Sequence, residues 1–294
     1  MTGSAQQETR KASMELLKLM RPRQWVKNIF VLAPLVFAGA FRSPAAQGAV
    51  LLAFVLFCIA SSAAYIVNDL QDIDKDRRHP VKSKTRPLAA GTVSVRAALL
   101  LLGLLYLVLL SAWWWQPGVV KVLAVYLALN LAYSFGLKHQ PVLDIFLVAF
   151  GFVLRVYAGA EALAVPVSSW MFVTTMCLAL YLAAVKRRQE LSQRGSEARE
   201  VLQHYSVALV DRYAEMAAMG ALVFYSLFVM SSRPELVVTV PVVLFGLFRY
   251  WYVVETLEGG ESPTDVLLSD LPLLLTVLVW MGACLWVLWP AAGG

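Results

Sequence analysis

The strongest constraint on this sequence is its division into long apolar runs separated by short charged stretches. Of its 294 residues, 60% are hydrophobic and 15% are charged, compared with about 45–50% and about 25% in soluble domains. Most apolar runs approach the roughly 20 residues that an α-helix needs to cross a bilayer. The pattern predicts an all-α, multi-pass membrane protein and excludes a soluble enzyme, a disordered chain and a collagen-like repeat.

Hydropathy predicts nine membrane spans. The residues before the first span are polar and basic, and an apolar alternation at residues 14–20 predicts a short helix on the membrane surface. We therefore expect one transmembrane domain over residues 1–294, with residues 1–24 as a cytoplasmic, interfacial leader. The predicted spans are 25–41, 48–68, 97–115, 119–135, 142–163, 168–185, 215–232, 236–254 and 271–289.

Basic residues are distributed unevenly among the predicted connections. Twenty of the 25 Lys and Arg residues lie in the leader or in alternate loops, whereas the other side has only Arg42, Lys121 and Arg233. By the positive-inside rule, the leader and the basic loops are cytoplasmic. We expect a multi-pass protein of the cell (inner) membrane with a cytoplasmic N-terminus. Because topology accounts for the basic residues, we expect no nucleic-acid partner.

The most informative motif is AYIVNDLQDIDKDRRHPVKSKTRPLAAG, at the end of the second predicted span. Asn68, Asp72 and Asp76 are spaced at i, i+4 and i+8, which predicts that they share one face of a helix, with Asp69 beside Asp72. Stacked like charges repel unless a cation neutralises them. Oxygen donors without Cys or His favour Mg²⁺ or Ca²⁺, and protein-bound Mg²⁺ commonly completes its shell with substrate phosphates. The motif therefore predicts a magnesium–diphosphate site.

A dense basic run directly follows these carboxylates. It supplies cations for phosphate oxygens within about 20 residues of the metal ligands, which is a set suited to phosphoryl recognition. The alternative is a solvated, charged helix end that only terminates the span. The run consists of Arg77, Arg78, Lys82, Lys84 and Arg86.

The motif NDLQDIDKD, followed by HPVKSKTRPLAAG, resembles the first aspartate-rich motif of the UbiA superfamily of intramembrane prenyltransferases. That resemblance implies nine transmembrane helices around a central cavity. Four further segments are similar to the branch that transfers phosphoribose to polyprenyl phosphate, and the resemblance covers nearly the whole chain. They are RPRQWVKN at 21–28, YSFGLKHQPVLDI at 133–145, FVLRVYAGA at 152–160 and SPTDVLLSD at 262–270.

The resemblance implies a reaction in which 5-phosphoribose 1-diphosphate donates its phosphoribosyl group to polyprenyl (decaprenyl) phosphate and releases diphosphate. In that branch the product leads to decaprenylphosphoryl-arabinose and cell-wall arabinan. Mg²⁺ would bind Asp72 and Asp76, with Asn68 and Asp69 assisting, which makes these four residues the catalytic candidates. The branch also implies a homo-trimer.

One departure from the superfamily pattern favours this branch. Ordinary members carry a second aspartate-rich motif at the end of span six, where this chain has YLAAVKRRQEL. Lys186 and Glu190 stand where two aspartates are expected, and Arg187 adds positive charge. The change predicts a second anion site, with Lys186 and Arg187 binding substrate, in place of a second metal. The alternative is a basic flank that only sets topology.

Several other side chains are candidates for binding phosphate. Arg155 lies inside a predicted span, where a charge is costly, and so is expected to face the cavity and contact phosphate or pair with Asp144 through an intervening group. Lys27 is explained equally well by juxtamembrane anchoring. The remaining candidates are Gln24 with Asn28, Tyr133 with Lys138, and Lys82 with Arg86.

Two alternative functions stay open at this stage. An aromatic prenyltransferase of quinone or haem synthesis would share the fold, but its prenyl diphosphate would require the missing second acidic motif. A transporter would also place charges at helix ends. It explains the Asn68 to Asp76 spacing poorly, and no pair of Gly/Pro-broken helices appears in matching halves of the sequence.

Overall fold

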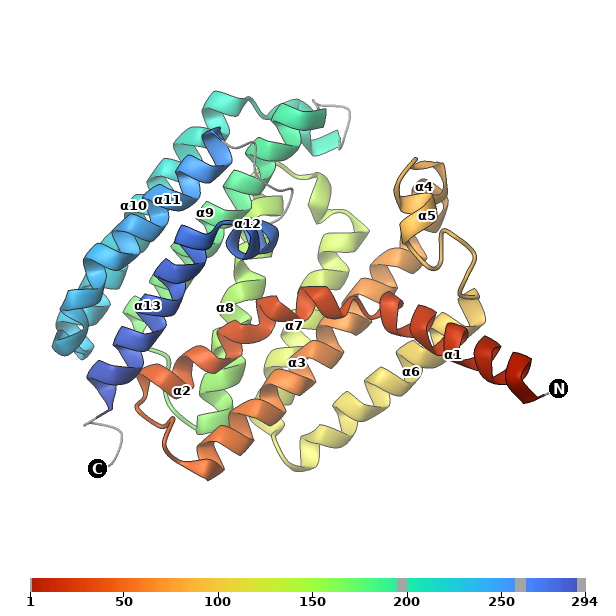
Figure 1. Ribbon diagram of the computed structural model, residues 1–294, viewed down its shortest axis with the longest axis horizontal. Coiled ribbons are helices and arrows are strands. Elements are labelled where there is room, and N and C mark those ends of the chain that lie inside the picture. The colour runs from red at the N-terminus through yellow and green to blue at the C-terminus, as the bar shows by residue number, and fades with distance from the viewer. Residues whose placement is uncertain (1, 195–199, 257–262, 290–294) are drawn as a thin grey trace.

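The computed structural model describes residues 2–194, 200–256 and 263–289, and this described part contains helices and no strand. Figure 1 shows the helices as a tilted bundle with α1, Thr2–Leu19, projecting from one side. Eight helices are long and apolar enough to cross a membrane, which confirms the predicted all-α, multi-pass class. They are α3 (Pro44–Gln71), α6 (Val95–Ser111, extended by η2, Ala112–Trp114), α7 (Pro117–Phe135), α8 (Leu143–Leu163), α9 (Ser169–Arg194), α10 (Val207–Ser232), α11 (Val240–Thr256, preceded by η6, Pro234–Thr239) and α13 (Leu271–Leu288).

The first predicted span has a different form. Residues Pro22–Leu32 form a 3₁₀ helix, η1, which continues into the five-residue α-helix α2, Ala33–Phe37. The segment packs against α3 and α8. At Gly159 of α8, an added Cβ would lie only 1.9 Å from the carbonyl oxygen of Val31. Only a glycine permits this approach, which keeps the irregular backbone covered by protein.

The long helices form two neighbouring groups. In Figure 1, α3, α6 and α7 occupy one side and α9, α10, α11 and α13 occupy the other, while α8 contacts both α7 and α9. One buried cluster, which includes Phe57 and Tyr126, joins α3, α7 and α8. A second, which includes Tyr181 and Tyr250, joins α9, α10 and α11. The two largest apolar clusters of the described residues are therefore joined through α8.

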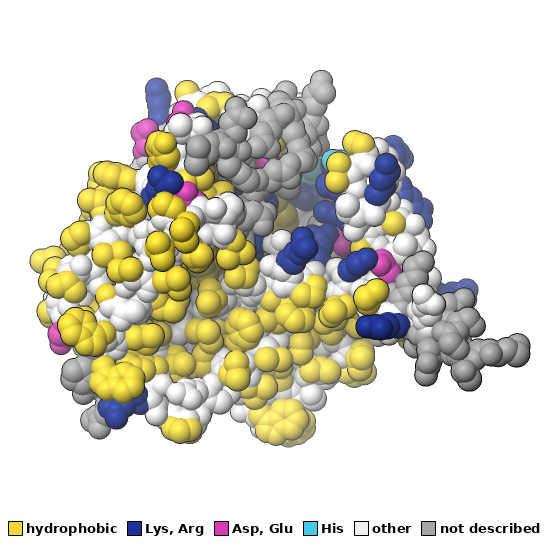
Figure 2. Space-filling view, in the orientation of Figure 1, with side chains coloured by type: hydrophobic (Ala, Val, Ile, Leu, Met, Phe, Trp, Pro, Cys, Tyr) yellow, Lys and Arg dark blue, Asp and Glu magenta, His cyan; other side chains and the backbone are white. Residues whose placement is uncertain are grey.

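The outward helix faces carry large apolar side chains. Leu100, Leu104 and Leu107 of α6 and Phe248 of α11 are among those more than half exposed. Such surfaces are normal for lipid contact and unusual for a protein in water. Trp114, at 83% exposure, and Trp286, at 80%, add large aromatic rings to this surface. The broad apolar band in Figure 2 follows these helices.

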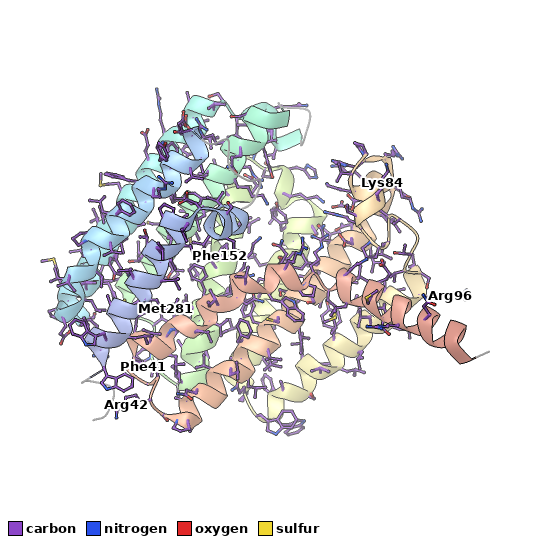
Figure 3. The ribbon with its side chains drawn as sticks, viewed as in Figure 1. Phe41, Arg42, Lys84, Arg96, Phe152 and Met281 are labelled. Atoms are coloured by element: carbon purple, nitrogen blue, oxygen red, sulfur yellow. The ribbon has the colours of Figure 1, made fainter. Side chains whose placement is uncertain are left out.

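Charged side chains gather at one end of the bundle. Here α3 leads into the short helices α4 (Ile73–Arg78) and α5 (Lys82–Thr85), which form a separate small lobe in Figure 1. Figure 2 shows Lys and Arg side chains covering this lobe, and Figure 3 labels Lys84 there and Arg42 near the opposite end of the molecule. The connections η3 (Leu137–His139) and η5 (Glu200–His204) and the helix α12 (Pro263–Ser269) complete the described elements.

Candidate active site

The acidic motif does not lie on one continuous helix. α3 ends at Gln71, and Asp72 is its C-cap residue with φ −93° and ψ 9°. A second helix, α4, begins at Ile73. The prediction that one helical face carries Asn68, Asp72 and Asp76 is therefore wrong. The break at Asp72 divides the motif between two sets of partners.

Asp69 and Asp76 form the first set, and both are 2% exposed. Nη1 of Arg86 donates to Oδ1 of Asp69 at 2.9 Å and also to Oδ2 of Asp76. Nη2 of Arg21 donates to the same Oδ1 of Asp69, and Nζ of Lys82 lies 3.6 Å from Oδ1 of Asp76. Because buried carboxylates require neutralisation, these three cations fix the turn from α3 into α5.

Asn68 and Asp72 form the second set and face α7 and η3. Oγ of Ser134 donates to Oδ1 of Asn68 at 3.3 Å. Nζ of Lys138 donates to Oδ1 and Oδ2 of Asp72 at 3.1 and 3.4 Å. The Lys138 and Asp72 side chains are 17% and 23% exposed. This pair is thus more accessible than the buried carboxylates on the other side of the motif.

The donor chemistry of this motif fits a hard divalent cation. Asn68 and the aspartates offer oxygen atoms only, which is the ligand set that Mg²⁺ prefers. In the described residues, no three His, Cys, Asp or Glu side chains already converge as ligands. Basic side chains neutralise the carboxylates in this arrangement, and Asp72, held by a single flexible lysine, is the most accessible carboxylate of the ion-paired three.

The end of α9 contains a buried network of charges. Nε of Arg187 donates to Oδ2 of Asp144 at 2.6 Å, and its Nη1 donates to Oε2 of Glu190 at 2.7 Å. The hydroxyl of Tyr205 donates to Oδ1 of Asp144 at 2.8 Å. Burial raises the pKa of Tyr205 above its usual range, and the bond to Asp144 raises it further, so the hydroxyl keeps its proton. Arg187, predicted to bind substrate, is held by protein carboxylates.

The neighbouring residues at this end form ion pairs between helices. Nε of Arg188 donates to Asp211 of α10 at 2.7 Å, and its Nη2 donates to Glu255 of α11. Arg249 of α11 donates twice to Asp270, at 3.0 and 2.7 Å. These ion pairs join α9, α10, α11 and the beginning of α13.

Arg155 lies deeper, between three aromatic rings. Its Nε donates to Oδ1 of Asn28 at 2.8 Å, and its Nη1 donates to the carbonyl of Gly151 at 2.7 Å. The guanidinium carbon lies 4.9–5.3 Å from the ring centres of Phe57, Tyr126 and Phe152. Asp144, expected to pair with Arg155 through an intervening group, is instead bound by Arg187 and Tyr205, whereas Arg155 donates to Asn28 and Gly151.

Asn28 explains why Arg155 tolerates this depth. Asn28 is fully buried, and its Nδ2 donates to Sγ of Cys58 and Oγ of Ser61, both at 3.2 Å. Its Oδ1 accepts the hydrogen bond from Arg155, so the Asn28 amide joins η1, α3 and α8. Ser61 precedes Asp69 by eight residues, or about 12 Å along a helix. Arg155 therefore supports the segment below the acidic motif, and Asn28, a sequence candidate for phosphate contact, is committed to this network.

The remaining predicted residues lie at accessible or half-buried positions. Gln24 and Lys27 are on η1, Tyr133 is in the last turns of α7, and Lys186 precedes the buried Arg187 on α9; all four are half-buried. Lys138 and the pair Lys82 and Arg86 directly contact the acidic motif. The structure thus brings one group of predicted basic residues onto the predicted carboxylates.

Sequence reasoning did not identify three residues of this end as functional candidates. Arg21 contacts Asp69 from the start of η1, and its position in RPRQWVKN is the signal that points to it. Ser134 and Tyr205 contact Asn68 and Asp144 across 66 and 61 residues. Because such separations depend on how helices pack, no local pattern in the sequence indicates these two contacts.

Comparison with known proteins identifies relatives over almost the whole chain. A family model, the UbiA prenyltransferase family, matches residues 29–263. Decaprenyl-phosphate phosphoribosyltransferase from Mycolicibacterium smegmatis is 37% identical over 290 residues, covering 91% of this chain and 90% of that protein. The protein of the same name from Corynebacterium glutamicum is 36% identical and covers 90% of this chain and 84% of its own length.

Solved structures share the same fold at lower sequence identity. A UbiA homolog from Archaeoglobus fulgidus bound to DMAPP and Mg²⁺ has a TM-score of 0.72 and 20% identity, covering 93% of this chain and 99% of that chain. Among the relatives compared by sequence alone, a 4-hydroxybenzoate octaprenyltransferase from Shewanella halifaxensis is 30% identical over a shorter region, 56% of this chain and 58% of that protein. The helical arrangement is thus shared more widely than the sequence.

Proposed function

This chain belongs to the UbiA prenyltransferase family, and on that premise we propose that it transfers the 5-phosphoribosyl group of 5-phosphoribose 1-diphosphate to polyprenyl phosphate. The observation that carries this proposal is the layout of charge: carboxylates with exchangeable basic partners at the end of α3, and Lys186 at the end of α9, where other members of the family carry a second acidic motif. The relatives named decaprenyl-phosphate phosphoribosyltransferase support it over about 90% of the chain.

Asp72, Asp76 and Asn68 would hold Mg²⁺, with Asp69 assisting. When bound, the ion acts as a Lewis acid that neutralises the departing diphosphate. Asp69 has a further part, because its carboxylate holds both Arg21 and Arg86. It therefore positions two guanidinium groups beside the ligands. A homolog of the same fold is described as bound to Mg²⁺, which supports a divalent cation.

Basic residues around the motif would hold the substrate phosphates. Lys138 and Lys82 can turn from Asp72 and Asp76 to a diphosphate, because the substrate then provides their anionic partner. The carboxylates are thereby released to bind the metal. Arg86 would contact phosphate through its remaining donors. Lys27, Gln24 and Tyr133 are half-buried candidates for the lipid phosphate or the sugar 5-phosphate.

In the reaction, the bond from the anomeric carbon to the diphosphate oxygen breaks, and a phosphate oxygen of the lipid forms the new bond to that carbon. The lipid phosphate is already ionised, so no protein nucleophile is needed. Positioning and electrostatics supply the rate enhancement. The product, polyprenylphosphoryl-5-phosphoribose, would serve synthesis of decaprenylphosphoryl-arabinose and arabinan-type glycans.

At the end of α9, we propose Lys186 as the residue for a second phosphate. Arg187 and Arg188 are bound to Asp144, Glu190, Asp211 and Glu255, so their role there is to set the position of the helix end. We likewise assign Arg155 to holding η1 in place through Asn28. A phosphate contact would have to use the N–H groups that do not bind Asn28 or Gly151. The absence of an acidic motif at residues 181–191 disfavours an aromatic prenyltransferase, which would bind a prenyl diphosphate there.

The positive-inside distribution supports a cytoplasmic N-terminus and a cytoplasmic active site in the cell's inner membrane. The charged end described above contains the loops with most Lys and Arg residues, including Lys75 to Arg86. A homo-trimer, implied by the resemblance of the sequence, stays a prediction.

The proposal is tested by incubating purified protein in Mg²⁺ with polyprenyl phosphate and 5-phosphoribose 1-diphosphate, and measuring diphosphate release. We expect release that requires both the lipid phosphate and the metal. A matched reaction contains geranyl diphosphate and 4-hydroxybenzoate. Release only in that second reaction would refute phosphoribosyl transfer and establish aromatic prenyl transfer, whereas release in neither would refute both.

A further inference from the structure

The Tyr205 hydroxyl lies outside the acidic motif and belongs to the charged network at the end of α9. Tyr205 lies between η5 and α10 and is buried, with 8% of the residue exposed. The hydroxyl accepts a hydrogen bond from the backbone N–H of Val142 at 2.5 Å and donates to Oδ1 of Asp144 at 2.8 Å. It therefore holds the beginning of α8 at two points.

The backbone that Tyr205 holds is strained. Val142 has φ 70° and ψ −46°, a positive-φ conformation close to that of the strained form of the γ-turn, which costs energy for any residue with a Cβ and most for a β-branched one. Such a conformation persists only when neighbouring contacts enforce it. The contacts at this position are the N–H bond to Tyr205 and the start of α8, where Ile145 and Phe146 donate to the Val142 carbonyl at 3.1 Å.

Four residues before Val142, the same loop carries the lysine that contacts the motif. Lys138 lies in η3 and donates to both carboxylate oxygens of Asp72. Asp144, two residues after Val142, is buried and bound to Arg187 of α9. The short segment from Lys138 to Asp144 thus connects the acidic end of α3 with the basic end of α9, and η3 packs directly against η5.

We propose that Tyr205 is a positioning residue that fixes the strained backbone at Val142 and thereby holds Lys138 against Asp72. This inference rests on the proposed function only for its catalytic consequence. The geometric consequence, the placement of Lys138, exists without substrate. Removing the hydroxyl relaxes Val142 toward ordinary backbone angles and moves Lys138 away from the carboxylate.

The test uses Tyr205→Phe, which keeps the ring and removes only the hydroxyl. Tyr225→Phe is the matched control, because the Tyr225 hydroxyl is also buried and bonded, to Thr239 at 2.6 Å and Trp280 at 3.0 Å, in a separate cluster. Full-length proteins without substrate are treated briefly with acetic anhydride. Mass spectrometry then gives the acetylation rate of Lys138 relative to the exposed Lys121.

We expect the relative acetylation of Lys138 to rise at least about threefold in Tyr205→Phe and to stay unchanged in Tyr225→Phe, because a free amine reacts faster than a paired one. In the transfer assay, kcat/KM for the donor should fall about 10-fold in Tyr205→Phe, because the variant displaces Lys138, which we assign to the donor diphosphate.

The double variant Val142→Gly with Tyr205→Phe separates positioning from general stability. Glycine adopts positive φ without a Cβ penalty, so the native loop no longer needs the hydroxyl, and Lys138 acetylation should return toward the wild-type value. Unchanged acetylation in Tyr205→Phe, or an equal rise in Tyr225→Phe, would overturn the proposal. A further rise in the double variant would overturn the role of Val142. If the wild-type protein shows no phosphoribosyl transfer but the variants show the expected acetylation pattern, only the proposed function is refuted.

Discussion

The acidic end of α3 and the basic end of α9 both concentrate charge, but they neutralise it in different surroundings. At α3, the pair of Lys138 and Asp72 keeps 17% and 23% of its side-chain surface exposed. At α9, the pair of Arg187 and Asp144 keeps 4% and 0%. Water and ligands can therefore compete for the first pair, whereas the second is sealed within protein.

This difference separates charges that can change partners from charges that hold helices together. An exposed ion pair contributes about 0–1 kcal/mol, so exchanging its partners costs little. Removing one member of a buried pair leaves an uncompensated charge and costs about 3–5 kcal/mol. We infer that substrate exchange belongs to the α3 end, and that most of the α9 network maintains the geometry around it.

The largest expected effect is on activity at the α3 end. Asp72→Asn should lower transfer by about 10³-fold or more, because loss of a metal ligand removes several kcal/mol of charge stabilisation. The melting temperature should stay close to that of wild type, since the pair it breaks is partly exposed. Transfer and thermal unfolding are measured on the same preparation, with Asp74→Asn, 78% exposed, as the control.

Asp76→Asn sharpens the same experiment. Its carboxylate is buried between Arg86 and Lys82, so this change should reduce both transfer and thermal stability. Full Mg²⁺-dependent turnover in Asp72→Asn and Asp76→Asn would show that the acidic motif does not hold the metal.

A smaller effect, on stability, is expected at the α9 end. Asp144→Ala should lower the free energy of unfolding by about 3 kcal/mol, at the lower end of the range for breaking a buried pair, because Arg187 loses one of its two carboxylate partners and keeps Glu190. Thermal unfolding in detergent measures the loss against Glu235→Ala, an exposed carboxylate of η6. If Asp144→Ala unfolds like wild type and only loses activity, the division between exchangeable and structural charges is wrong.

The smallest of these effects concerns the one basic residue of α9 that we assign to substrate. Lys186→Ala should reduce kcat/KM by about 10- to 150-fold, the equivalent of a charged hydrogen bond of about 1.5–3 kcal/mol. Lys186→Asp should cost more, because it replaces attraction with repulsion. Lys75→Ala, at an exposed position on α4, controls for net charge. Near-normal rates in both Lys186 variants would leave α9 with a structural role only.

Much of the fold follows from patterns that are local in the sequence. Apolar runs of membrane length predicted the eight long helices. The acidic motif was predicted at the end of the second span, which corresponds to the end of α3. The break at Asp72 was missed because i, i+4 spacing assumes that the helix continues. Residues 25–41 were predicted as a regular span, although residues 22–32 form a 3₁₀ helix, because hydropathy measures apolar content and does not distinguish 3₁₀ from α backbone.

The candidate site was predicted less completely than the fold. Lys82, Arg86 and Lys138 contact the carboxylates of the acidic motif, and their binding of phosphate stays a prediction. Arg187, in contrast, was predicted to bind substrate because the sequence alone does not distinguish a basic residue that binds a ligand from one that pairs with a buried carboxylate. Its partner Asp144 lies 43 residues away, and only the packing of α8 on α9 brings the two together. Whether a basic residue is free to bind a ligand thus depends on tertiary contacts.

The single amide of Asn28 has a consequence for how this protein is made. Asn28 and Arg155 are separated by 127 residues, and the carbonyl of Val31 rests on Gly159. A ribosome must therefore synthesise the chain through α8 before η1 can acquire its native contacts. The apolar segment η1 leaves the ribosome before α8 but is completed after it, and its final backbone is shaped by a helix that does not yet exist when η1 is translated.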